Sequence, residues 1–308
     1  MNIAAQSIIH KIHLQHNENS FYIKRDDLLP FSFGGNKARK VKYFFEEILS
    51  GDYGAVITYG SGSSNHCRVV ANMAASNGKK CYIVSPEEEY HETFNSLMVK
   101  KFGASIIKTP LNNVSETIDN LFSELSSEKP YFIPGGGHGN LGTQAYVDAY
   151  YEICDFEKQN NIYFDYIFHA CGTGTTQAGL VCGAALNDDK NRNIIGISIA
   201  RANPRCKQVV ENSVTDYLSS VQYSKQYPSV VVDDSYISGG YAKYNKEIVS
   251  CVNDLLIENG IPLNTTYTGK AFWGMKEYIS KNDIRCKNVL FLHTGGCPLF
   301  FDDFEGIK

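Results

Sequence analysis

A lysine that follows two glycines is the first candidate for chemistry in this sequence. The segment Phe33–Lys42 reads FGGNKARKVK, and Lys37 opens a stretch with helical apolar spacing through Phe44, Phe45 and Ile48. The glycine pair lets the backbone take positive φ or approach another segment closely. The positive end of a helix, together with burial, lowers the pKa of a lysine and favours its neutral amine. A Schiff-base lysine needs that amine, so we predict this role for Lys37 and keep an exposed surface lysine as the alternative.

A loop rich in glycine and threonine is the second candidate. Gly172–Thr176 reads GTGTT and lies between an expected strand, Asp165–Ala170, and an expected helix, Thr175–Leu186. Backbone N–H groups at a helix N-terminus and three threonine hydroxyls suit a phosphate monoester. The loop lacks the Gly-Lys-Ser/Thr of a Walker motif, and Gln177 stands where a dinucleotide-binding loop has its third glycine. One phosphate and a reactive lysine together point to pyridoxal 5′-phosphate, an aldehyde cofactor that acts as an electron sink.

A third loop could bind a carboxylate. Ser63, Ser64, Asn65 and His66 open the expected helix Asn65–Asn77. Ser64 or Asn65 occupies the N-cap position, so plain helix capping is one interpretation. The other interpretation is that the helix N–H groups and these side chains bind the carboxylate of a substrate.

The elements that must position these loops alternate between strand and helix. The expected strands are Ala55–Tyr59, Lys80–Val84, Ser105–Lys108, Tyr131–Ile133, Asp165–Ala170, Ile194–Ile199 and Asn288–Leu292. The expected helices are Asn65–Asn77, His91–Phe102, Val114–Leu125, Gly142–Gln159, Thr175–Leu186, Lys243–Glu258 and Lys270–Ser280. This alternation predicts parallel strands with helices on both faces, and ligands in such sheets collect at the carboxyl ends of the strands. Residues 201–238 allow no clear assignment.

Composition excludes several classes of protein. The chain has 308 residues and a net charge of −4, which argues against a nucleic-acid binder, and no run of about 18 apolar residues predicts a membrane helix. Nine cysteines without a C-x-x-C pair indicate reduced thiols, and the first residues lack a secretory pattern, so we expect a cytoplasmic protein. His10, His13 and His16 match no familiar ligand spacing, and no metal site is expected.

Seven motifs carry a resemblance to a known family. They are KRDDL (Lys24–Leu28), GGNKARK (Gly34–Lys40), SSNHCR (Ser63–Arg68), CGTGTTQAGL (Cys171–Leu180), GGYA (Gly239–Ala242), TYTGKAFWGM (Thr266–Met275) and HTGGCPLF (His293–Phe300). In this order they resemble the D-cysteine desulfhydrase / 1-aminocyclopropane-1-carboxylate deaminase family of fold-type II, tryptophan synthase β-like pyridoxal phosphate enzymes. The resemblance implies an α/β fold with two open, twisted, mostly parallel sheets and helices on both faces. It also implies a small substrate-side domain, residues 42–144, inserted into a large cofactor-binding domain of residues 1–41 and 145–308.

The resemblance further implies roles for single residues. Lys37 would bind the cofactor and move the α-proton, and Ser64, Tyr241 and Tyr267 would also be catalytic. The implied cofactor-binding residues are Lys37, Asn65, Gly172, Thr173, Gly174, Thr175, Thr176, Thr268 and Thr294. The implied substrate-binding residues are Ser64, Asn65, His66 and His138.

Two positions favour the desulfhydrase branch of the family. Where the deaminase branch has a glutamate and a leucine, this chain has Thr268 and Thr294. A carboxylate beside the pyridine nitrogen would keep it protonated and strengthen the electron sink, whereas a threonine hydroxyl supplies no such charge. Opening a carbon–carbon ring bond needs the stronger sink, and expelling a thiolate needs less. We therefore expect α,β-elimination from a small amino acid, D-cysteine first, with the chirality taken from the resemblance.

Three positions depart from the family pattern and keep alternatives open. Ser63 replaces a usual glutamine, His138 replaces a small polar residue, and Ala242 replaces the glycine after the motif tyrosine. These changes surround the expected substrate, so we keep as alternatives deamination of the cyclopropane amino acid, and β-replacement or racemisation of a specialised amino acid. A phosphate-ligand binding module without catalysis is an alternative from another class. The resemblance also implies a homodimer.

Overall fold

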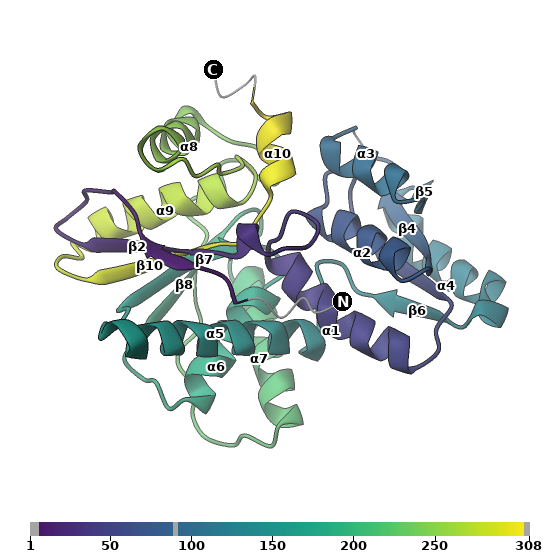
Figure 1. Ribbon diagram of the computed structural model, residues 1–308, viewed down its shortest axis with the longest axis horizontal. Helices are drawn as coiled ribbons and strands as arrows, with labels where there is room; N and C mark the ends of the chain where they lie inside the picture. The colour runs from purple at the N-terminus through teal and green to yellow at the C-terminus, as the bar shows by residue number, and fades with distance from the viewer. Residues whose placement is uncertain (1–5, 89–91, 305–308) are drawn as a thin grey trace.

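The computed structural model describes residues 6–88 and 92–304 and contains two sheets (Figure 1). The larger sheet has the strand order β1 (Ile9–Lys11), β2 (Ser20–Arg25), β10 (Asn288–His293), β7 (Tyr166–Cys171), β8 (Asn193–Ser198) and β9 (Val231–Asp233). The smaller sheet has the order β5 (Ser105–Thr109), β4 (Lys80–Pro86), β3 (Ala55–Tyr59) and β6 (Pro130–Ile133). All neighbouring strands pair in parallel except β1 with β2.

Helices cover both faces of each sheet (Figure 1). On the larger sheet, one face packs against α5 (Asn140–Asn160), α6 (Thr175–Leu186) and α7 (Arg205–Ser220), and the other against α8 (Lys246–Asn259) and α9 (Thr268–Lys281). On the smaller sheet, one face packs against α1 (Asn36–Ser50), α2 (Asn65–Ser76) and α3 (Phe94–Lys101), and the other against α4 (Val114–Glu124). The short helix α10 (Cys297–Asp302) follows β10 and lies against α3. The expected α/β fold with helices on both faces is therefore confirmed.

The central strands are apolar along their whole length because both of their faces are buried. In β7, Ile167 belongs to the core under α5 and α6, whereas the next residue, Phe168, belongs to the core under α9. In β10, Leu290 and Phe291 divide between the same two cores. Successive side chains of a strand point to opposite faces, so a strand covered on both sides needs a continuous apolar run.

All seven expected strands are present, but the described residues also contain three strands and two α-helices that lie outside the expectations. The strands β1, β2 and β9 and the helix α7 belong to segments with few apolar residues or with mixed polarity, and α10 is an apolar segment of only six residues. The expected helix at His91–Phe102 begins in the structure at Phe94, and His91 lies outside the described residues.

A buried network of four charges anchors α1 against the larger sheet and α5. Lys24 of β2 donates to Glu152 of α5 at 2.5 Å. Arg39 of α1 donates to Glu152 at 2.7 Å and to Asp26 at 2.9 Å. Two cations and two carboxylates balance, and their hydrogen bonds offset the cost of burying them. Because Lys37 lies two residues before Arg39, this network also positions the candidate cofactor lysine.

The chain passes from the larger sheet to the smaller sheet through α1 and returns through α5. All strands of the smaller sheet lie between residues 55 and 133, whereas those of the larger sheet lie before residue 26 or after residue 165. We infer that residues 42–144 form an inserted domain and that residues 1–41 and 145–308 form the domain around it. Both boundaries then fall inside a helix.

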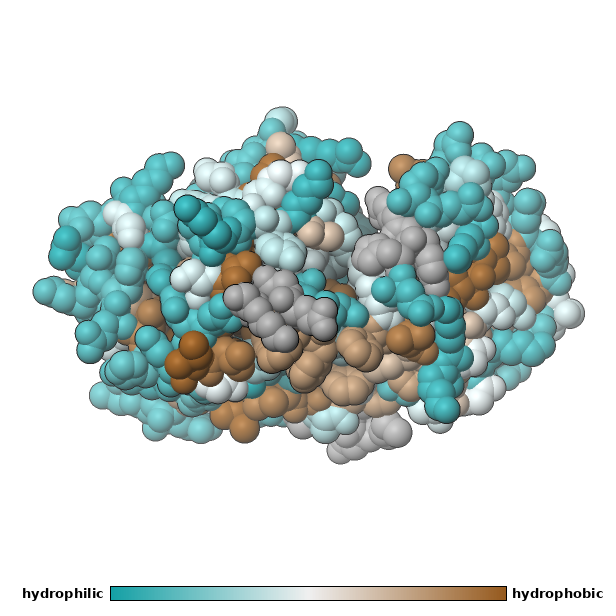
Figure 2. All heavy atoms as spheres, turned by 90° about the horizontal axis from the view of Figure 1, so that it is seen from above, coloured by the Kyte–Doolittle hydropathy of each residue, from teal (hydrophilic) through white to brown (hydrophobic). Residues whose placement is uncertain are grey.

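The surface seen from above is mostly hydrophilic, with apolar side chains gathered in a band across the lower middle of the view (Figure 2). Phe33, Phe94 and Phe301 are among the exposed large apolar residues. Within residues 6–88 and 92–304, no helix is both long enough and apolar enough to cross a membrane. The same residues contain no group of three or more His, Cys, Asp or Glu side chains placed to hold a metal ion.

Candidate active site

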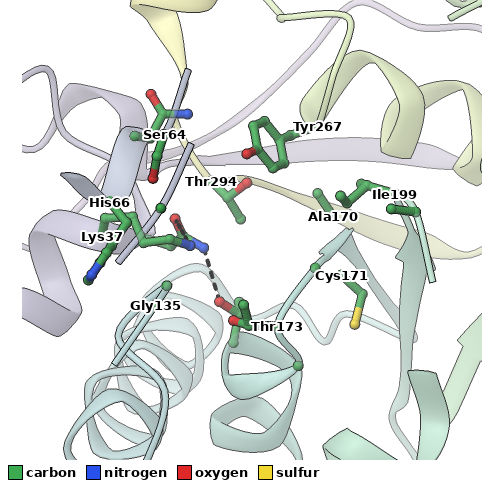
Figure 3. A pocket seen from close by; sticks show the side chains of 18 of the residues that line it. Lys37, Ser64, His66, Gly135, Ala170, Cys171, Thr173, Ile199, Tyr267 and Thr294 are labelled. Atoms are coloured by element: carbon green, nitrogen blue, oxygen red, sulfur yellow. Dashed lines mark hydrogen bonds between the residues drawn. The ribbon is translucent and has the colours of Figure 1, made fainter. Parts of the chain in front are cut away.

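A cavity of about 560 Å³ lies where loops from both sheets meet. Most of its walls come from segments that follow the carboxyl ends of β3, β6, β7, β8 and β10, and the start of α1 and two tyrosines complete them. Figure 3 shows Lys37, Ser64 and His66 along one side and Cys171 and Ile199 along the other. Parallel sheets present their ligand sites at this edge, so the fold brings the separate motifs together here.

Interlocking glycines place the start of α1 beside the end of β10. Gly35 has φ +90°, and a Cβ atom at this position would lie 2.7 Å from the backbone oxygen of Thr294. A Cβ on Gly295 would lie 2.6 Å from the Cα of Gly35. The Asn36 N–H donates to the same Thr294 oxygen at 3.0 Å. The expectation that the glycine pair permits both positive φ and a close approach is confirmed, and the approach carries Lys37 to Thr294.

Lys37 enters the cavity from the first turn of α1. Burial lowers the pKa of its ammonium to about 8, so a larger fraction is the neutral amine than for a surface lysine. Lys37 Nζ donates to the Asn36 side-chain oxygen at 3.2 Å, and the Asn36 amide donates to Thr176 Oγ1 at 3.1 Å. Asn36 thus links the candidate cofactor lysine to the candidate phosphate loop.

The loop after β7 has the properties of an anion site. Gly174 is the N-cap of α6 with φ +90°, and no side chain caps the helix there. An uncapped helix N-terminus offers backbone N–H donors and partial positive charge to an anion. Gly172, Thr173, Gly174 and Thr176 line the cavity. Thr175 is buried and lies outside the lining, where its hydroxyl is 3.1 Å from Nδ1 of His138.

The N-terminus of α2 forms another wall. Ser64 is the N-cap and its hydroxyl accepts from the Cys67 N–H at 3.2 Å, as the capping interpretation predicts. The hydroxyl hydrogen remains available to donate, so capping leaves room for a second role. The Asn65 side-chain oxygen accepts from Arg68 at 2.7 Å and from Asn95 at 3.1 Å, which fixes the orientation of the Asn65 amide.

Hydrogen bonds determine the tautomer of His66. The hydroxyl of Thr58 donates to the Ile133 carbonyl at 2.7 Å, so it accepts from Nε2 of His66 at 2.8 Å. Burial, with the charges of Lys37 and Lys40 adding to it, lowers the pKa of His66 to about 3, and the ring is neutral. Nε2 therefore carries the hydrogen and Nδ1 is an acceptor, which has no partner among the described residues. A carboxylate at this wall would take its hydrogen bonds from other groups, including the N–H groups of α2.

Two tyrosines of the cavity wall form a pair. The hydroxyls of Tyr241 and Tyr267 are 2.6 Å apart, and their rings meet edge to face at 5.8 Å. The Tyr267 N–H donates to the side-chain oxygen of Asn264 at 2.7 Å. Asn264 also donates to Thr268 Oγ1, from its backbone at 3.1 Å and from its side chain at 3.0 Å. Thr268 is fully buried and supports this turn from outside the cavity lining.

Eleven of the fourteen predicted site residues line the cavity. They are Lys37, Ser64, Asn65, His66, Gly172, Thr173, Gly174, Thr176, Tyr241, Tyr267 and Thr294. The other three, Thr175, Thr268 and His138, lie behind the lining. Sequence reasoning assigned no role to Asn36 or to Arg201, which lines the cavity and donates to the Gly172 carbonyl at 3.0 Å. Asn36 could have been found from its place beside Lys37, but Arg201 begins the segment that the sequence left unassigned.

These features fit pyridoxal phosphate. A lysine of lowered pKa suits the aldehyde, and the uncapped helix with its threonine hydroxyls suits the phosphate. No Asp or Glu of residues 6–88 and 92–304 lines the cavity, so no carboxylate opposes a bound anion. An acidic chain can hold a dianionic group here because helix ends and loop N–H groups supply local positive potential.

Comparison with known proteins agrees with this fit. Residues 8–295 match the family model described as pyridoxal-phosphate dependent enzyme. A Pyrococcus abyssi protein named as a candidate 1-aminocyclopropane-1-carboxylate deaminase is 33% identical over 287 residues, which are 91% of this chain and 85% of that protein. The D-cysteine desulfhydrase of Serratia proteamaculans is 29% identical over 290 residues, 91% of this chain and 87% of that protein. A crystal structure described as an ACC deaminase homologue superposes with a TM-score of 0.85 at 29% identity, covering 99% of this chain and 94% of the other.

Proposed function

This chain belongs to the family of pyridoxal-phosphate-dependent enzymes with fold type II, and from that premise we propose that it catalyses α,β-elimination from a small D-amino acid. D-cysteine is the first substrate that we propose. The relatives of this chain include proteins named for desulfhydrase and for deaminase activity. The family therefore gives the cofactor and the general class of lyase but leaves the substrate open.

The absence of acidic side chains from the cavity is the observation that carries the proposal. Among the residues that the structure describes, Thr294 lines the cavity after β10, and neither Asp nor Glu is part of the lining. A carboxylate beside the pyridine nitrogen of the cofactor would hold a proton on that nitrogen and strengthen electron withdrawal. A site that offers the ring a neutral hydroxyl and no carboxylate favours the reaction that needs the weaker electron sink. Expulsion of a sulfur leaving group is such a reaction, whereas opening of a cyclopropane ring is not.

Different residues of the cavity bind the cofactor, bind the substrate and move the proton in this reaction. Pyridoxal phosphate supplies an aldehyde that an amine can attack and a conjugated ring that takes up electrons from the α-carbon. The N–H groups of α6 and the hydroxyl of Thr176 would hold the phosphate end. Lys37 Nζ takes the proton from the α-carbon of the substrate, because burial keeps a fraction of this amine neutral near pH 8. The N-terminus of α2 with Ser64 and Asn65 holds the substrate carboxylate.

Departure of the leaving group completes the reaction. The paired hydroxyls of Tyr241 and Tyr267 can give a proton to the departing sulfur, since both line the cavity. The overall balance is D-cysteine plus water giving pyruvate, ammonia and hydrogen sulfide. The initial product of elimination is aminoacrylate, which hydrolyses to pyruvate and ammonia.

Incubation with four substrates tests the proposal. The cofactor-loaded protein is given D-cysteine, L-cysteine, β-chloro-D-alanine or 1-aminocyclopropane-1-carboxylate, and the oxo acids are separated and measured. We expect pyruvate from D-cysteine and β-chloro-D-alanine. Formation of 2-oxobutyrate from the cyclopropane amino acid, with no pyruvate from D-cysteine, would assign the chain to the deaminase activity for which its Pyrococcus relative is named.

We also propose that the chain is a homodimer and works in the cytoplasm. All nine cysteines are free thiols and seven of them are buried, which suits a reducing compartment. Exposed aromatic side chains such as Phe33 and Phe301 offer apolar surface to a second copy. Light scattering on the eluted protein measures the assembly directly, and a mass of one chain at micromolar concentration would contradict the dimer.

A further inference from the structure

A chain of hydroxyl groups leads from the loop after β3 to the tyrosine pair. Ser61 Oγ lies 3.3 Å from Ser63 Oγ, and Ser63 Oγ lies 3.4 Å from the hydroxyl of Tyr241. The next contact, from Tyr241 to Tyr267, is 2.6 Å. Four hydroxyls therefore follow one another, with Ser63 as the link between the serine side and the tyrosine side.

Ser63 is held in place but is not itself part of the cavity wall. Ser63 is 5% exposed as a residue, whereas Ser61, Tyr241 and Tyr267 all line the cavity. Asn95 of α3 donates to the Ser63 carbonyl at 2.8 Å, and the Ser64 N–H donates to the Ser61 carbonyl at 3.0 Å. The backbone on both sides of the link is thus fixed, so only hydroxyl rotation is needed to change its hydrogen bonds.

We propose that Ser63 is a positioning residue that joins Ser61 to the tyrosine pair in a hydroxyl relay, and that this relay replaces the proton given to the leaving group. The inference rests on the proposed elimination and identifies how its proton is supplied. The contacts of 3.3 and 3.4 Å are long for hydroxyl hydrogen bonds, and catalytic hydrogen bonds commonly shorten when the substrate is bound.

The proton balance of the relay is closed at each step. The sulfur leaving group keeps the electron pair of the broken carbon–sulfur bond and takes a proton from a tyrosine hydroxyl. The tyrosinate takes the proton of Ser63 through Tyr241, and Ser63 takes one from Ser61, which is resupplied by water. A hydroxyl can accept and donate at one atom, whereas the glutamine usual at position 63 accepts at oxygen and donates at nitrogen. Ser63 therefore gives this chain a route that the family pattern lacks.

Two substrates with different leaving groups test the relay. Hydrosulfide is a basic leaving group that benefits from a proton, whereas chloride leaves as a stable anion. The variants Ser63→Ala and Ser63→Thr are compared with wild type on D-cysteine and β-chloro-D-alanine. Ser85→Ala is the matched control, because Ser85 is a buried serine on β4 whose hydroxyl has no partner among the described residues.

The expected result is a selective loss. A general acid contributes roughly 10²–10⁴-fold, so removing a link behind it should lower kcat on D-cysteine by about 10-fold or more. With β-chloro-D-alanine, whose chloride leaves without a proton, kcat should change by less than about 3-fold. Ser63→Thr, which keeps the hydroxyl, should retain the wild-type ratio of the two rates, and Ser85→Ala should leave both rates unchanged. A smaller normal solvent isotope effect on D-cysteine turnover in Ser63→Ala than in wild type would support the same conclusion.

The remaining outcomes distinguish failure of the relay from failure of the proposed elimination. If Ser63→Ala slows both substrates equally, or slows neither, the relay is wrong while the proposed elimination stands. If the wild-type protein releases pyruvate from neither substrate, the proposed function fails and the relay falls with it. Unfolding temperatures of Ser63→Ala and Ser85→Ala are measured beside the rates. A loss of folded protein lowers both rates by the same factor, so the ratio of the two rates decides for or against the relay.

Discussion

Replacing Gly35 by alanine tests how the two ends of the chain are brought together at Lys37. The added Cβ would lie 2.7 Å from the Thr294 oxygen and 3.1 Å from the Gly295 Cα, and both are backbone atoms that cannot rotate away. Gly35 also has φ 90° and ψ 174°, a region that is almost restricted to glycine. The variant therefore combines backbone strain with a steric clash.

Gly139→Ala is the matched control for the strain. Gly139 has φ 110° and ψ −178°, which is nearly the same backbone region, and a Cβ there would meet nothing within 4 Å. Each substitution should cost about 1–3 kcal/mol from the backbone conformation. Forcing the backbone at Gly35 away from Thr294 should add about 1–3 kcal/mol, the usual cost of overpacking.

Urea unfolding measures the loss of stability in both variants, provided that the dependence of the unfolding free energy on urea concentration is the same as in wild type. The absorbance of the cofactor measures its capture by Lys37. A shift of about 1 Å at a reacting group costs roughly 100-fold in rate, so Gly35→Ala should lose at least that much activity. Equal destabilisation of the two variants, with wild-type cofactor capture by Gly35→Ala, would refute the reasoning. In that case the contact between the start of α1 and the end of β10 would not position the lysine.

Three further predictions follow from the site and its support. Because burial lowers the pKa of Lys37 to about 8, the rate of cofactor capture by the apoprotein should rise with pH to a midpoint near 8 and then level off; a rate still rising at pH 10 in stopped-flow absorbance would contradict this. Burial alone would raise the pKa of Asp26, but Arg39 and Lys24 outweigh it and hold the pKa at about 2, so this carboxylate contributes stability above about pH 4 that is lost as pH falls toward 2. Asp26→Asn should therefore cost about 3–5 kcal/mol of unfolding free energy at neutral pH. The free energy of unfolding of this variant, measured in urea at each pH, should fall less steeply than that of wild type as the pH is lowered across this range. Ser64→Ala should cost about 1 kcal/mol of stability through its lost cap and should slow elimination while cofactor absorbance stays at the wild-type level.

Much of the site could be predicted because its loops follow apolar strands. The runs at β3, β7 and β10 have few alternative interpretations, and the polar loop after each must lie at the same edge of a parallel sheet. The glycine pair before Lys37 predicted a close approach, and the structure shows Thr294 as its partner.

The remaining features depend on contacts that no local pattern reveals. β2 contains Lys24, a charge that is buried only because Glu152, 128 residues away, pairs with it. Side-chain direction was equally hidden. Thr175 turns toward His138 and Thr268 toward Asn264, so both lie behind the lining that their motifs suggested they would form. Arg201 was missed because the segment that it opens has no clear periodicity in sequence.

Chemical trapping of the cofactor tests the central claim most directly. Burial lowers the pKa of four lysines, Lys24, Lys37, Lys40 and Lys270, and of these four Lys37 alone lines the cavity. Protein loaded with pyridoxal phosphate is reduced with borohydride, digested and examined by mass spectrometry. We predict a pyridoxyl label on the peptide that contains Lys37, at that residue. A label at Lys24, Lys40 or Lys270, or a fully active protein that carries none, would contradict the account.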